Sequence, residues 1–92
     1  VRFEPFSGLV TISGRVTTPG GLGLRNAVVR MTDLQSNLVR TATTSSFGFY
    51  SFTNVLAQTN YFINPVSKRY RFTGQDLNAS GNLTNIDFVG LE

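Results

Sequence analysis

The chain has 92 residues, which is enough for one hydrophobic core and too few for two. It contains no cysteine and no histidine, so disulfides, thiol nucleophiles, Ser-His-Asp triads and ordinary zinc sites are excluded. The net charge is +3, but only 14% of the residues are charged, against roughly 25% in soluble domains. Thr, Ser, Asn and Gln must therefore form much of the polar surface.

The first strand is predicted at residues 10–17, where apolar and polar residues alternate. Val10, Ile12 and Val16 share one face, as the two-residue period of a strand requires. Gly14 occupies an inward position, which predicts close approach by another backbone or by a large ring. The Pro- and Gly-rich segment 19–23 ends the strand.

Later segments repeat this pattern between turn signals. Further strands are predicted at 26–32, 38–44, 49–53, 61–63, 69–73 and 83–89. Pro65 is predicted to end the fifth strand or to mark it as an edge. The aromatic side chains that share strand phase are assigned to the core: Tyr50, Phe52, Tyr61, Tyr70, Phe72 and Phe88. Because each strand has one apolar face, two facing antiparallel sheets of about seven strands would bury all of these faces together.

Several motifs resemble carboxypeptidase regulatory-like domains. Residues 12–17, a Gly-rich turn and then 26–33 resemble the opening of that family. The stretch from Thr41 through Gly48-Phe49-Tyr50-Ser51-Phe52 to Tyr61 is similar to its Thr-x-x-x-Gly-x-Tyr-x-Phe-x-x-Val…Tyr core. Residues 70–73 and 83–89 resemble the final hairpin of copies in surface proteins. The resemblance implies an all-β, Ig-like or transthyretin-like (prealbumin-like) sandwich with Greek-key connections.

The resemblance also implies an accessory module and not an enzyme. Such domains follow the catalytic unit in some metallocarboxypeptidases, precede outer-membrane receptors, and recur in tandem along bacterial surface and secreted proteins. We therefore expect an extracellular or cell-surface location, with neighbouring domains of the same polypeptide as partners. Two turns depart from the family pattern. Residues 56–61 lack its Pro-Ala-Gly, and Ser45-Ser46-Phe47-Gly48 lacks its Asp, a potential side-chain cap.

The predicted domain spans residues 10–90. Residues 1–9 are assigned to an N-terminal linker or edge segment. Leu91-Glu92 resembles a cloning scar and is left out of the predicted domain. No apolar run approaches the roughly 20 residues that cross a bilayer, so membrane insertion is not expected.

The acids do not form a catalytic pattern. Glu4, Asp33, Asp76 and Asp87 fall in turns or outward strand positions, whereas a glycosidase needs two carboxylates facing each other across a cleft. Asp33, Asn37, Asp76 and Asn78 offer oxygens to calcium, but no Asp-x-Asp-x-Asp run is present, so turn formation is the favoured interpretation. No enzyme activity, metal or other cofactor is predicted.

The exposed interaction residues are predicted to be Phe49 and Phe62, together with Tyr70 and Arg71 in the loop around Tyr70; strand phase alone places the Tyr70 ring in the core, so the two predictions for Tyr70 compete. Aromatic residues out of strand phase, or in turns, would contact a neighbouring domain or stack on carbohydrate, and both alternatives stay open: Phe3, Phe6, Phe47, Phe49 and Phe62. Surface proteins and polysaccharide are the external partners considered. Nucleic acid is not expected, because only the run 68–71 gathers basic residues while the other arginines are scattered: Arg2, Arg15, Arg25, Arg30 and Arg40.

Overall fold

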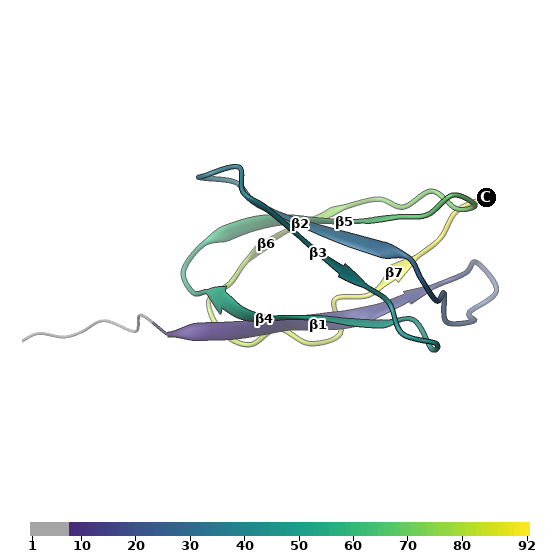
Figure 1. Ribbon diagram of the computed structural model, residues 1–92, viewed down its shortest axis with the longest axis horizontal. Coiled ribbons are helices and arrows are strands. Elements are labelled where there is room, and N and C mark those ends of the chain that lie inside the picture. The colour runs from purple at the N-terminus through teal and green to yellow at the C-terminus, as the bar shows by residue number, and fades with distance from the viewer. Residues whose placement is uncertain (1–7) are drawn as a thin grey trace, which may run out of the picture.

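The computed structural model describes residues 8–92, which form a sandwich of two sheets and contain no helix (Figure 1). The strands are β1 Leu9–Thr17, β2 Val28–Asp33, β3 Val39–Thr43, β4 Phe49–Leu56, β5 Asn60–Val66, β6 Gln75–Asn78 and β7 Phe88–Val89. One sheet has the order β4-β1-β7 and the other β3-β2-β5-β6. The all-β sandwich is confirmed. With no helix in 8–92, none there could span a bilayer. Most of the predicted N-terminal linker, including Phe3 and Phe6, lies outside the described residues.

The core forms where the alternating faces of the two sheets meet. Val10, Ile12 and Val16 of β1 are buried, as the sequence predicts. In the same sheet they lie beside Tyr50 and Phe52 of the antiparallel neighbour β4. The other sheet contributes its own alternating set to the same cluster: Val29, Met31, Tyr61 and Ile63. β1, β2, β4 and β5 therefore each bury one face, and these faces close a single core.

Gly14 meets another backbone, as predicted. A Cβ atom at this position would collide with the carbonyl of Ile86. The Ile86 amide donates to the Ser13 carbonyl oxygen at 3.0 Å, and the Tyr50 hydroxyl donates to the Ile86 carbonyl oxygen at 2.6 Å. The glycine lets the C-terminal segment lie directly on β1.

The prediction of a strand at residues 69–73 is wrong. Arg71 forms only an isolated antiparallel bridge to Leu91, and the sixth strand is instead β6. The sequence of β6, Gln-Asp-Leu-Asn, has one apolar residue and poor intrinsic strand preference, and it becomes a strand because it pairs with β5. Tyr70 and Phe72 are consequently half-buried at the rim and do not lie in the core.

Pro65 does not make β5 an edge along its whole length. β5 lies between β2 and β6, but β6 pairs only with Asn60–Ile63. At Pro65 the strand has β2 as its one neighbour, and it ends at the next residue, Val66. The missing N–H of proline is tolerated where the ladder is one-sided.

Both turns that depart from the family pattern obtain their hydrogen bonds from other groups. The Ser45 hydroxyl accepts the Phe49 amide at 3.2 Å, and Gly48 adopts a φ of 86°. Serine therefore supplies the side-chain acceptor that aspartate would supply. In the other turn, Gln58 has a φ of 61° and its amide donates to the Ala79 carbonyl oxygen at 2.8 Å. This turn is held by the segment after β6.

Candidate functional site

The four candidate interaction residues do not form one site. Phe49 lies on the outer face of the three-stranded sheet and is 56% exposed, whereas Phe62 lies on the outer face of the four-stranded sheet and is 37% exposed. Tyr70 and Arg71 lie in the connection between β5 and β6. The structure thus places the two phenylalanines on opposite faces of the sandwich.

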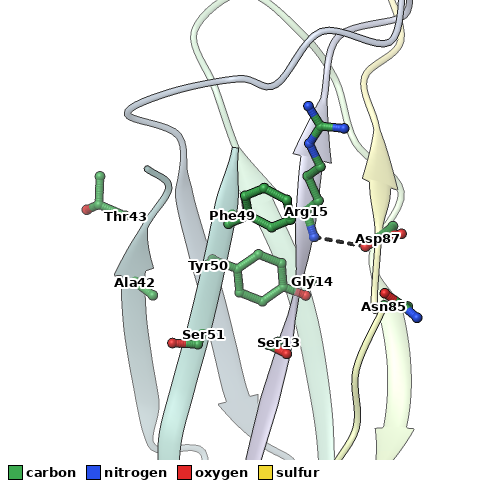
Figure 2. Close-up of a pocket in the computed structure, with 10 residues that line it drawn as sticks. All are labelled: Ser13, Gly14, Arg15, Ala42, Thr43, Phe49, Tyr50, Ser51, Asn85 and Asp87. Atoms are coloured by element: carbon green, nitrogen blue, oxygen red, sulfur yellow. Dashed lines mark hydrogen bonds between the residues drawn. The ribbon is translucent and has the colours of Figure 1, made fainter. Parts of the chain in front are cut away.

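A hollow of about 540 Å³ lies beside Phe49, and we call it the Arg15 hollow (Figure 2). β1 and β4 form its floor, β3 one side, and the segment before β7 the other side. The residues that define it are Ser13, Arg15, Thr43, Phe49, Asn85 and Asp87. Phe49 is the exposed aromatic ring that lines this hollow.

The Arg15 side chain is held in place by groups of the protein. Its Nε donates to the Phe47 carbonyl oxygen at 2.9 Å, and its guanidinium carbon lies 5.3 Å from the centroid of the Phe49 ring. This distance is within the range of a cation–π interaction. Figure 2 shows the Phe49 ring beside Arg15. The pair presents a flat ring and a fixed positive charge together.

Asp87 faces the backbone of β1. One carboxylate oxygen accepts the Arg15 backbone amide at 2.9 Å, which is the dashed line of Figure 2. Its own carbonyl oxygen accepts Nε2 of Gln75 at 3.0 Å. The carboxylate is thus used as a backbone acceptor.

Tyr50 lies under the hollow as a hydrogen-bond donor. Burial raises the pKa of its hydroxyl well above the ordinary value of 10.0, and the negative charge of Asp87 raises this pKa further. The phenol stays protonated and donates to Ile86. It is therefore a structural donor and not a general base.

Of the calcium candidates, Asp33 and Asn37 flank the turn between β2 and β3, whereas Asp76 and Asn78 lie in strand β6. Among residues 8–92 no group of three or more Asp, Glu, His or Cys residues is placed to hold a metal ion. Asp33 Oδ1 accepts the amides of Gln35 at 2.8 Å and Ser36 at 3.2 Å, and the Gln35 hydrogen bond lowers the pKa of Asp33. Asn78 donates to the side-chain oxygen of Asn60 at 2.7 Å.

The fold brings one scattered arginine to the basic run. Arg25 joins Lys68 and Arg69 around a hollow of about 470 Å³ between the start of β2 and the end of β5. Arg69 also lies over the Tyr70 ring, 5.3 Å from its centroid. No local pattern pointed to Arg25, because its proximity to Lys68 depends on the pairing of β2 with β5.

Asn82 and Asp87 are the residues whose roles the sequence did not reveal. The Asn82 side-chain oxygen accepts the Thr11 amide at 2.9 Å, as Asp87 does for Arg15. Both contacts join opposite ends of the chain, so neither residue stands in a recognisable local motif.

These features define a two-sheet β-sandwich module. The chain matches the family model of the carboxypeptidase regulatory-like domain over residues 11–89, and it belongs to that family. The resemblance noted from its motifs is confirmed. The family is a β-sandwich module that is often accessory and typically non-catalytic.

A comparison with solved structures confirms the fold. The chain is similar to part of the Bacillus anthracis TIE protein, with a TM-score of 0.64 and 11% sequence identity. The match covers 91% of this chain and 17% of that chain, so this chain spans a small part of the other protein's length. No curated protein matches the sequence.

Proposed function

We propose that the chain is a non-catalytic spacer and interaction module of a longer secreted or cell-surface protein. The observation that carries this proposal is the position of its ends. β1 starts at one end of the long axis and the chain finishes at the other (Figure 1). The nine residues of β1 alone span about 30 Å at the usual rise of a strand. Each module would add its length between its neighbours.

Exposed apolar side chains at both ends support neighbouring domains as partners. Leu9 and Leu56 are paired across β1 and β4 at the N-terminal end, and they are 57% and 56% exposed. At the C-terminal end, Val89 of β7 is 58% exposed. Adjacent apolar groups that remain exposed in one domain are suited to contacts with the next domain.

Single-molecule energy transfer tests the spacer function. The whole chain is inserted between a donor and an acceptor protein, as one copy or as two in tandem. We expect one narrow distribution of the donor–acceptor distance, and we expect the second copy to lengthen this distance by a fixed amount. The matched control is a Gly/Ser linker of equal residue number, which gives a broad distribution. A distribution as broad as that of the linker would contradict the proposal.

The Arg15 hollow supports a second function, the binding of polysaccharide. An exposed ring beside a fixed guanidinium offers stacking and a charged hydrogen-bond donor to a sugar. Glycan-array binding should be lost in Phe49→Ala and kept in Phe62→Ala, its matched control on the opposite face. If both variants melt at the temperature of the parent, the loss of glycan binding is due to the missing Phe49 ring. Equal binding by both variants would exclude this site.

A further inference from the structure

The first and last segments of the described chain lie side by side and run in the same direction. Residues 82–90 follow β1 from residue 11 to residue 17, and we call this contact the terminal seam. Its regular part is the β1–β7 ladder, where Val16 pairs with Phe88 and Thr17 with Val89 in parallel. An isolated parallel bridge between Ile12 and Leu83 marks its other end.

Hydrogen bonds join the seam along its whole length. Every second residue of β1 directs its backbone groups to the C-terminal segment. The backbone bonds are Leu83 N to Thr11 O at 2.9 Å, Ser13 N to Leu83 O at 2.9 Å, Ile86 N to Ser13 O at 3.0 Å and Gly90 N to Thr17 O at 2.8 Å.

Side chains complete the seam where residues 82–87 are not a regular strand. Asn82 accepts the Thr11 amide and Asp87 accepts the Arg15 amide, each at 2.9 Å. These two donors would otherwise face the seam without a backbone acceptor. Hydrogen bonds to an ionised acceptor are stronger than neutral ones, so Asp87 is the stronger of the two.

The seam also has a buried side. Phe88 is 3% exposed, and its ring lies 6.4 Å from the Tyr50 ring between centroids. Tyr50 in turn donates to Ile86. A movement of residues 82–90 along β1 would break the hydrogen bonds and would also withdraw Phe88 from the core.

We infer that the terminal seam is a mechanical clamp, which holds the domain folded when its two ends are pulled apart. This inference rests on the proposed function, in which the chain is tethered to neighbours at both ends. The two segments are parallel and leave the domain at opposite ends, so tension slides one along the other. All of the seam's bonds are then loaded together, whereas peeling would load them one after another.

Force spectroscopy in two pulling directions tests the clamp. The chain has no cysteine, so handles can be attached at chosen pairs. Leu9→Cys with Glu92→Cys pulls along the seam. Gly20→Cys with Glu92→Cys pulls at one end of it, and a Cβ at Gly20 would meet no atom closer than 3.8 Å. We expect a rupture force severalfold higher along the seam. Equal forces in the two directions would overturn the inference.

Side-chain variants assign the resistance to the seam. Asp87→Ala and Asn82→Ala should each raise the rate of unfolding along the seam, by about tenfold for Asp87, as the loss of a charged hydrogen bond implies. Asp76→Ala makes the same chemical change on the exposed outer face of β6 and is the matched control. An Asp87→Ala effect no larger than that of Asp76→Ala would also overturn the clamp.

The outcomes separate the clamp from the spacer function. Energy transfer is measured without load and reports only whether the separation of the ends is fixed. A narrow distribution with equal rupture forces would remove the clamp and leave the spacer. A broad distribution would remove the spacer, whatever the rupture forces.

Discussion

The two sheets of this sandwich are held together in different ways. The four-stranded sheet is a set of regular antiparallel ladders between strands of five or more residues and the short β6. In the three-stranded sheet β1 has a regular antiparallel ladder only with β4. Its other neighbour is a C-terminal segment in which only Phe88–Val89 is a strand and in which Asn82 and Asp87 replace ladder bonds. The four-stranded sheet and the β1–β4 ladder distribute their stability over many residue pairs, whereas the contact on the other side of β1 depends on a few residues.

The largest effect is expected where both sheets depend on the same side chain. Phe52 is 2% exposed, and its ring fills the core between β4 and the opposite sheet. Phe52→Ala should lower the free energy of unfolding by about 3–5 kcal/mol, because it leaves a large cavity. Urea denaturation measures this loss. A variant that melts like the parent would show that the inward register of β4 is wrong.

Gly14→Ala should break the three-stranded sheet selectively. The added methyl group meets the Ile86 carbonyl and must push the terminal seam away from β1. We expect a loss of about 2–3 kcal/mol, as for other overpacked sites. Gly20→Ala is the matched control, because a Cβ there contacts nothing closer than 3.8 Å. Equal stability of the two variants would contradict the close approach.

Thr44→Val probes the four-stranded sheet. The buried Thr44 hydroxyl accepts the Ala27 amide at 2.9 Å and donates to the Leu24 carbonyl oxygen at 2.6 Å. Valine keeps the shape and leaves both backbone groups without this partner, which costs about 1–3 kcal/mol. Hydrogen exchange should become faster at Ala27, while the Ser13 and Ile86 amides of the seam stay protected. Faster exchange in the seam would show that the two sheets are not separable.

Asp33 should give the smallest effect, visible only in acid. Its pKa is lowered on folding, so its charged form contributes stability above the ordinary value of 3.8, and this contribution is lost as the pH falls below that value. Asp33→Asn keeps an acceptor oxygen but does not titrate. The parent should therefore lose more stability than this variant as the pH falls from about 5 to about 3. Parallel acid titrations of the two proteins would contradict the assignment.

The contrast between the sheets also explains what the sequence could predict. The strict alternation of apolar and polar residues predicted β1 and its buried face. The inward position of Gly14 predicted a close approach, which the Ile86 backbone makes. Both signals are local. β6 could not be found, because its Gln-Asp-Leu-Asn sequence becomes a strand only through pairing with β5, while the better pattern at residues 69–73 lacks a neighbouring strand.

In the candidate sites too, local features could be predicted from the sequence and long-range contacts could not. Exposure of Phe49 and Phe62 could be expected from their outward phase, but their placement on opposite faces depends on the division of strands between sheets. Arg25 approaches Lys68 and Arg69 through the β2–β5 pairing, and Asp87 reaches Arg15 through the contact of the two chain ends. Such long-range contacts leave no spacing signal in one sequence.

Distances between spin labels show whether the parallel terminal seam places the first residue of β1 and the C-terminus at opposite ends of the module. Labels at Leu9→Cys and Glu92→Cys should give a narrow distribution at about 30 Å or more, the span of β1. Labels at Gly20→Cys and Glu92→Cys should give a clearly shorter distance, because Gly20 follows closely after Thr17, which pairs with Val89 near the C-terminus. A Leu9–Glu92 distance shorter than the Gly20–Glu92 distance, or a broad distribution, would contradict the parallel arrangement of the terminal seam.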